Sequence, residues 1–187
     1  MRVLFVAALE EETRALAAHV PVHHLGVGKV QAAASLAAGL AADPADLVVN
    51  VGTAGGLHGQ PLGTVVEVAR VHQHDFDHAG VSRFVGRPLR GGPLELGGPH
   101  GAAGRLATGD RLVASPKQRA RLAEHADVVD MEGYAVAAVA RAFGREVWLT
   151  KVVSDGADAE LFGTWHDGLR ACGERLADWA EGRGLLA

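Results

Sequence analysis

The clearest signal of the fold is the run Thr150-Lys151-Val152-Val153-Ser154-Asp155-Gly156-Ala157-Asp158. It continues an apolar run that starts at Val147, and this run of residues 147–153 predicts a buried strand that ends in two polar residues, Ser154 and Asp155. Open α/β sheets bind their ligands in a crevice at the carboxyl ends of the strands. Asp155 is therefore a candidate acid in such a cleft.

Two further carboxylates are expected at the same sheet edge. Glu132 follows a second short strand, residues 127–129, and begins an Ala- and Val-rich helix over residues 132–143. Glu12 follows the opening strand, residues 2–7. Because the carboxyl ends of parallel strands meet at one edge, the sequence predicts three acids around a single cleft.

Strands and helices alternate along the rest of the chain. We expect strands over residues 47–51 and 64–71, and helices over residues 10–18, 29–42, 115–125 and 165–181. We interpret residues 52–56 as a glycine turn, and residues 72–104 as loops and short strands. The alternation predicts one α/β domain, residues 1–187, with a mixed but largely parallel central sheet flanked by helices. A chain of 187 residues suits one core better than two.

Composition and charge exclude several classes of function. The net charge is −4 and there is no basic block, which argues against a nucleic-acid partner. No apolar stretch reaches the roughly 18 to 20 residues of a membrane span. The apolar start meets Glu10 instead of a cleavage site, so it predicts a strand and not a signal peptide. The lone Cys172 suits a reducing compartment. We expect a cytoplasmic protein with a small-molecule ligand.

Two glycine-rich loops could approach that ligand. Gly26-Val27-Gly28-Lys29 precedes a helix and could offer backbone N–H groups to an anion. It lacks the Walker spacing and the full dinucleotide fingerprint, so a tight turn is the preferred interpretation. In Asn50-Val51-Gly52-Thr53-Ala54-Gly55-Gly56-Leu57 the small residues would let a ligand approach the backbone, and Thr53 offers a hydroxyl. A simple turn remains the alternative there.

These motifs together resemble the purine nucleoside phosphorylase and nucleosidase superfamily. Within it the chain is most similar to the methylthioadenosine/S-adenosylhomocysteine nucleosidases and their relatives, the futalosine hydrolases. The resemblance covers nearly the whole chain, because six motifs occur in the family's order. They are Glu10-Glu11-Glu12, Gly26-Val27-Gly28-Lys29-Val30, the loop from Asn50 to Leu57, Thr108-Gly109-Asp110, Asp130-Met131-Glu132 and Ser154-Asp155-Gly156-Ala157-Asp158.

The resemblance implies a catalytic role for each acid. Breaking a ribosyl–purine bond develops an oxocarbenium-like sugar and a leaving base that needs a proton. Asp155 would protonate purine N7, with a pKa raised by burial or neighbouring carboxylates and with Ser154 orienting it. Glu132 would bind the ribose hydroxyls while Met131 packs on the sugar or base. Glu12 would orient and deprotonate the attacking water.

The resemblance also implies the remaining contacts. Thr53 would touch the substrate, backbone groups around Leu112 and Val113 would pair with the base, and Trp165 would cover the substrate with an aromatic ring. The family needs no cofactor or metal and forms homodimers. In a homodimer, His74 and Phe76 would lie near the subunit interface and the 5′ end of the substrate.

Each role has a plainer alternative. Glu12 could be a solvated glutamate in a first helical turn, where acids favour the helix dipole. Asp155 could be a helix N-cap. Met131 and Trp165 could be ordinary core residues. His72-Gln73-His74-Asp75-Phe76-Asp77-His78 could suggest a metal site, but it lacks further ligand-spaced residues, and we expect no metal.

Water and phosphate are the competing nucleophiles. Phosphorylases of this superfamily place arginines around the anion, and many carry one just before the glycine loop, where this chain has Asn50. This favours hydrolysis. Lys29 keeps phosphorolysis open, since one lysine can serve an anion site.

The chain departs from the nucleosidases in several places. It is shorter between residues 18 and 26 and between residues 77 and 105. Lys151 stands where they usually have Arg, Asp130 where they have Glu, and Leu112-Val113 where an aromatic residue often precedes an aliphatic one. These differences leave the 5′ substituent open.

We therefore expect a nucleosidase of methionine salvage that acts on 5′-modified adenosines such as methylthioadenosine and S-adenosylhomocysteine. The alternatives are a futalosine hydrolase of menaquinone biosynthesis, a phosphate-dependent purine nucleoside phosphorylase, and a non-catalytic purine-binding module. Retention of all three acids speaks against the last.

Overall fold

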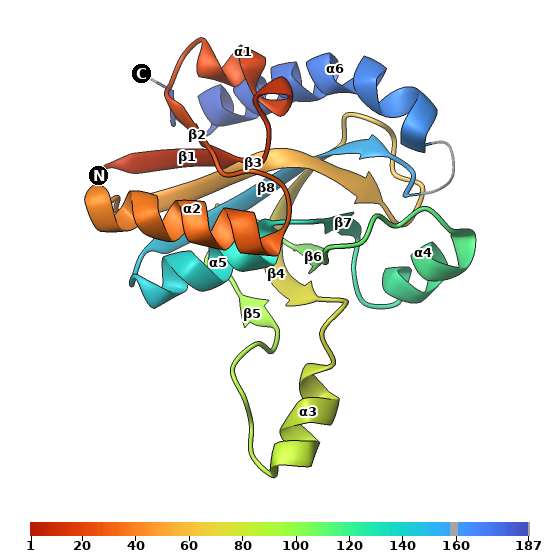
Figure 1. Ribbon diagram of the computed structural model, residues 1–187. Helices are drawn as coiled ribbons and strands as arrows, with labels where there is room; N and C mark the ends of the chain where they lie inside the picture. The colour runs from red at the N-terminus through yellow and green to blue at the C-terminus, as the bar shows by residue number, and fades with distance from the viewer. Residues whose placement is uncertain (158–160, 187) are drawn as a thin grey trace.

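A mixed β-sheet with helices on both faces forms the centre of the computed structural model (Figure 1). The structure describes residues 1–157 and 161–186, with no side chains for residues 161–167. In this part of the chain the sheet has eight strands. They are β1 (Val3–Ala7), β2 (Val22–His24), β3 (Leu47–Gly56), β4 (Val65–Gln73), β5 (Leu94–Glu95), β6 (Gly104–Thr108), β7 (Val128–Asp130) and β8 (Glu146–Asp155).

The sheet is largely parallel, as the sequence predicts, but it closes on itself. Strands β2, β1, β3 and β8 are successive parallel neighbours. Strand β8 then pairs antiparallel with β4, which continues through parallel β6 and β7, and β7 pairs antiparallel with β3. Strands β3, β8, β4, β6 and β7 thus form a ring. Closure removes the free edges that an open sheet would leave on these strands.

The two longest strands, β3 and β8, lie side by side and are buried along almost their whole length. Buried parallel strands carry continuous apolar runs because helices cover both faces. The expected turn at residues 52–56 is wrong, since β3 continues to Gly56. The missing side chain at Gly55 leaves room for its neighbours. A Cβ there would lie only 3.0 Å from both the Asp155 Oδ1 and the Ala157 Cβ.

Two layers of helices cover the sheet (Figure 1). Helices α2 (Lys29–Ala42) and α5 (Gly133–Ala142) pack together on one face. Helix α6 (Leu161–Gly182) lies on the other face, with the 3-10 helix η1 (Glu10–Glu12) and α1 (Arg14–Ala17) packed against it. The helix expected over residues 10–18 is thus split at Thr13, whose backbone is not helical. None of the described helices is long and apolar enough to cross a membrane.

Neighbouring residues of β3 face opposite layers. Val48 packs with Leu36 and Val136 in the cluster beneath α2 and α5. Val49 packs with Leu16 in the cluster beneath α6. The alternation follows the two-residue period of a strand and anchors β3 from both sides.

Helix α3 (His78–Val85) lies in the stretch for which the sequence predicts only loops and short strands. The Asp77 carboxylate accepts a hydrogen bond from the Gly80 N–H at 2.8 Å, and Gly86 ends the helix with a φ of 75°. No residue of α3 is buried, and the helix projects from the body (Figure 1). Val81, Phe84 and Val85 share one exposed apolar face, but eight residues in a stretch rich in Gly and Pro give too short a repeat to predict a helix. Helix α4 (Pro116–Ala123) lies beside β7 and matches the expected segment.

Candidate active site

A cavity of about 540 Å³ opens where β1, β3, β7 and β8 end. It is the crevice that the sequence predicts at the carboxyl ends of the strands. Most of the predicted site residues line it: Glu12, Thr53, Leu112, Met131, Glu132, Ser154 and Asp155. The other lining residues are Ala8, Leu9, Val27, Ala54, Gly55, Val129 and Asp130.

Two predicted site residues are not among those that line the cavity. The Val113 side chain is buried in a separate apolar cluster with Leu57 and Leu122, so only its backbone could serve a ligand. Trp165 belongs to α6, but its side chain lies outside the described residues. Leu112 lines the cavity and is half exposed.

Glu12 is held by three donors. Its Oε1 accepts hydrogen bonds from the Thr53 N–H at 2.9 Å and the Thr53 hydroxyl at 2.5 Å, and its Oε2 accepts one from the Leu9 N–H at 3.2 Å. Only 5% of its surface is exposed, whereas Glu10 and Glu11 face solvent. The alternative of a solvated first-turn glutamate is therefore wrong for Glu12.

Asp155 ends β8 and is also buried. Its Oδ2 accepts a hydrogen bond from the Ser154 hydroxyl at 2.8 Å, and its Oδ1 accepts one from the Ala157 N–H at 2.8 Å. The second bond forms a local turn of the kind that Asp side chains favour. Gly156 and Ala157, which follow Asp155, are not helical, so Asp155 is not a helix N-cap.

Glu132 directly precedes α5, and its side chain contacts the loop Gly26-Val27-Gly28-Lys29. Its Oε1 accepts a hydrogen bond from the Gly28 N–H at 2.7 Å. Burial, with smaller contributions from the charges of Asp130 and Glu12, raises the pKa of Glu132 to about 7, although Lys151 and the Gly28 hydrogen bond oppose the rise. The carboxyl group thus changes charge near neutral pH. The loop donates this N–H to a side chain of the protein, in keeping with the interpretation as a turn.

A buried ion pair supports the three acids. The Lys151 Nζ lies 2.9 Å from the Asp130 Oδ2, and both side chains are almost fully buried. Asp130 also accepts hydrogen bonds from the Thr108 hydroxyl at 2.6 Å and the Gly133 N–H at 2.8 Å. Burial lowers the pKa of Lys151, but the attraction of Asp130, Glu132 and Glu12 outweighs this and raises it. Lys151 therefore stays charged and offsets the negative charge around the cavity.

Sequence reasoning noted the substitutions at positions 130 and 151 but missed this pairing. One signal was available in the sequence. Asp130 and Lys151 both depart from the residues usual in the nucleosidases, and paired changes of this kind can indicate that two side chains are in contact.

The Lys29 ammonium group contacts two carboxylates and one amide oxygen of the protein. Its Nζ lies 2.5 Å from the Asp75 Oδ1, 3.1 Å from the Gln73 Oε1 and 3.6 Å from the Asp110 Oδ2. Of the residues described, none that lines the cavity is an arginine or a lysine. The Asn50 amide is buried and donates to the Val6 carbonyl at 3.2 Å. The cavity thus offers a phosphate no cationic side chain among these residues.

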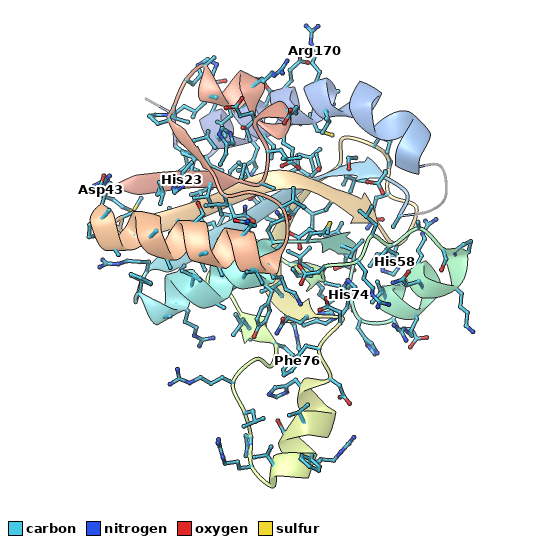
Figure 2. All side chains as sticks on the ribbon, viewed as in Figure 1. His23, Asp43, His58, His74, Phe76 and Arg170 are labelled. Carbon is cyan, nitrogen blue, oxygen red and sulfur yellow. The ribbon has the colours of Figure 1, made fainter. Side chains whose placement is uncertain are left out.

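The histidine-rich segment lies outside the cavity lining. Burial lowers the pKa of His74, more than the nearby Asp75 raises it. Phe76 is 40% exposed and lies between the body and α3 (Figure 2). Across the described side chains, no three of the His, Cys, Asp and Glu residues are grouped to hold a metal ion.

Comparisons with known proteins identify the family of the chain. The sequence model of the phosphorylase superfamily matches residues 6–181. The 5′-methylthioadenosine/S-adenosylhomocysteine nucleosidase of Haemophilus ducreyi is 30% identical over 152 residues, which cover 71% of this chain and 66% of that protein. The enzyme of the same name from Bacillus velezensis is 33% identical over 157 residues, covering 72% and 67%. The match thus spans about two thirds of the length of these relatives.

A solved structure shares the fold. The 5′-methylthioadenosine/S-adenosylhomocysteine nucleosidase from S. pneumoniae, solved with a transition-state inhibitor, superimposes with a TM-score of 0.82 at 23% identity. The superposition covers 95% of this chain and 96% of that one. The shorter segments of this chain therefore leave the architecture intact.

Proposed function

The chain belongs to the phosphorylase superfamily, and from this membership we propose that it is a nucleosidase that hydrolyses the N-glycosidic bond of 5′-modified adenosines. Methylthioadenosine and S-adenosylhomocysteine are the proposed substrates, since the curated relatives at 30% and 33% identity carry these names. One observation carries the proposal: Glu12, Glu132 and Asp155 are buried around one cavity that none of the described lysines or arginines lines.

The proposed reaction consumes one water. The bond between ribose C1′ and purine N9 breaks, the base leaves with the electron pair, and the sugar becomes oxocarbenium-like. Asp155 donates a proton to purine N7 so that the base leaves neutral. Water attacks C1′ while Glu12 takes its proton. The products are the free base and the 5′-substituted ribose.

Local contacts support these roles. The Ser154 hydroxyl and the Ala157 N–H fix the Asp155 carboxyl in one orientation. Thr53 and Leu9 do the same for Glu12, so its carboxylate is positioned before a water arrives. Thr53 therefore acts on the substrate through Glu12 in this scheme.

Glu132 acts on the sugar. Its ionised form accepts hydrogen bonds from the ribose hydroxyls, and its negative charge favours the positive charge that develops on the ring. Met131, the neighbouring residue of the cavity wall, packs on the sugar or base. The Leu112 and Val113 backbone reads the base, and Trp165 covers the substrate.

We also propose a cytoplasmic homodimer. Helix α3 exposes Phe84 by 92% and Val85 by 46%, and Phe76 beside it is 40% exposed. Large apolar side chains grouped on one surface mark a site of association. A second copy covering this surface would bury these side chains.

Phosphorolysis is the second candidate, and Lys29 alone favours it. Its ammonium group already contacts two carboxylates, which would repel an incoming phosphate. Water is therefore the favoured nucleophile.

Product analysis tests the proposal. Methylthioadenosine, S-adenosylhomocysteine, futalosine, adenosine and inosine are each incubated with the protein, with and without phosphate, and free base is measured by chromatography. We expect adenine from the first two without phosphate. Base release from futalosine alone would instead assign the futalosine hydrolase activity, release only with phosphate a phosphorylase, and no release a binding module.

A further inference from the structure

A ring of polar contacts surrounds Lys29 beside the cavity. The Lys29 Nζ contacts the Asp75 Oδ1 at 2.5 Å. The Asp75 Oδ2 accepts a hydrogen bond from the Asp110 N–H at 2.8 Å, and the Asp110 Oδ1 accepts one from the Lys29 N–H at 2.8 Å. The ring is closed, so each member fixes the other two. It joins the start of α2 to the segments that follow β4 and β6.

The ring fixes the backbone next to Glu132. Gly28 directly precedes Lys29, and its N–H donates to the Glu132 Oε1 at 2.7 Å. Gly28 has a φ of +87°, which L residues rarely adopt, and a Cβ there would lie 3.2 Å from the Asp110 Oδ1. The Gly28 N–H belongs to the peptide before Gly28, and the Lys29 N–H to the peptide after it. That second peptide is held by the bond from the Lys29 N–H to Asp110 and by the bond from the Ala32 N–H to the Gly28 carbonyl at 3.0 Å. These contacts constrain Gly28 from the side opposite to the N–H that meets Glu132.

We propose that Lys29 is a positioning residue which, through Asp75 and Asp110, holds the Gly28 N–H on the Glu132 carboxylate. The inference rests on the proposed function, in which Glu132 binds the ribose. Lys29 acts through Gly28 and is not itself one of the cavity-lining residues.

The charges are consistent with a stable ring. Burial raises the pKa of Asp75, but its hydrogen bonds to Lys29 and to the Asp110 N–H outweigh burial and lower it overall. The Lys29 side chain is 17% exposed and that of Asp75 22%, so solvent screens this pair only partly. Asp75 therefore stays ionised through the neutral range, in which Glu132 titrates.

Several groups besides Gly28 act on the Glu132 charge. Asp130 on β7 and Glu12 on η1 raise its pKa, while Lys151 on β8 lowers it. None of these belongs to the ring. Disrupting the ring thus removes the Gly28 contribution while the other charges stay in place.

The test is Lys29→Met, which removes the charge but retains the length of the side chain. The Glu132 carboxyl is titrated by ¹³C NMR in protein labelled at glutamate side chains and assigned with Glu132→Gln. We expect the midpoint to rise by about one pH unit, because the ionised form loses a hydrogen bond. The rising limb of kcat/KM against pH moves by the same amount, so activity at pH 7 falls about fivefold and largely recovers at high pH.

Lys117→Met on the exposed surface of α4 is the matched control, with no change in either readout. If Lys29→Met does not fold, Asp75→Asn breaks the same ring. A folded variant of either kind with the wild-type Glu132 midpoint overturns the proposal. The titration needs no substrate, so it still tests the ring if the wild-type protein releases no base and the proposed function fails.

Discussion

In the proposed reaction, three individual carboxylates carry the chemistry. Glu12 lies more than a hundred residues before Glu132 and Asp155 in the sequence, yet all three line one cavity. Each has a different set of partners: three donors hold Glu12, one backbone N–H meets Glu132, and two donors hold Asp155. Different surroundings allow identical functional groups to serve as base, sugar ligand and acid.

Glu132 makes stability depend on pH. Its pKa of about 7 in the folded state exceeds its usual 4.5. Between these values the folded chain retains a proton that the unfolded chain releases, so the free energy of unfolding decreases as pH rises from about 4.5 to about 7. Glu132→Gln removes this slope, which amounts to at most about 3 kcal/mol.

Urea unfolding of wild type and Glu132→Gln at pH 5, 6, 7 and 8 measures the difference. The variant should gain stability relative to wild type as the pH increases, with no further gain above pH 7. Parallel curves for the two proteins would disprove the raised pKa.

Lys151 compensates the buried acids. Lys151→Met leaves the Asp130 carboxylate without its counter-ion in a fully buried position. Breaking a buried pair in this way costs about 3 to 5 kcal/mol. Chemical denaturation checks this, with the exposed Lys117→Met expected to change stability by less than about 0.5 kcal/mol. Adding Asp130→Asn to Lys151→Met should restore part of the loss. A loss below about 1 kcal/mol would contradict the compensating role.

At the scale of elements, β3 and β8 carry the site. They pair in parallel from Leu47 and Glu146 onward, with a register shift at Ala54 and Gly55 where the strands reach the cavity. The shift places Gly55 against Asp155. The Asp155 carboxyl group can therefore occupy its position only because residue 55 has no side chain.

Gly55→Ala tests this packing. Its Cβ would lie 3.0 Å from the Asp155 Oδ1 and 3.2 Å from the Val129 Cγ1, so the carboxyl group must move. A displacement near 1 Å can reduce turnover about a hundredfold. We expect kcat to fall by tenfold to a hundredfold while the protein stays folded. Gly97→Ala, at a position with open space around it, is the control. An unchanged kcat in Gly55→Ala would show that the close approach of residue 55 to the Asp155 carboxyl group does not affect turnover.

At the scale of the whole molecule, local patterns predicted the elements and long-range pairing completed them. The sequence predicts buried strands such as β3 and β8, because a continuous apolar run indicates a buried strand whichever strands it pairs with. The three acids were readable because each follows a strand. Ring closure was not, since it depends on β4 pairing with β8 and on β7 pairing with β3.

The rest of the site was hidden for the same reason. The contact between Gly28 and Glu132 spans 104 residues, and that between Lys29 and Asp110 spans 81. No local period or composition signals such pairs. Helix α3 was missed for a different reason: it has eight residues within a stretch rich in Gly, Pro and His, so its apolar set Val81, Phe84 and Val85 is too short to establish a helical period.

Hydrolysis assisted by Glu12 is the step on which the proposed function depends. Adenine release from methylthioadenosine is followed in phosphate-free buffer for wild type and Glu12→Gln, with adenine affinity measured by calorimetry in both. We predict turnover by wild type, a loss of about 100-fold or more in Glu12→Gln, and similar adenine affinity. Near wild-type turnover in a folded Glu12→Gln protein would contradict the role of Glu12 as the base that activates water.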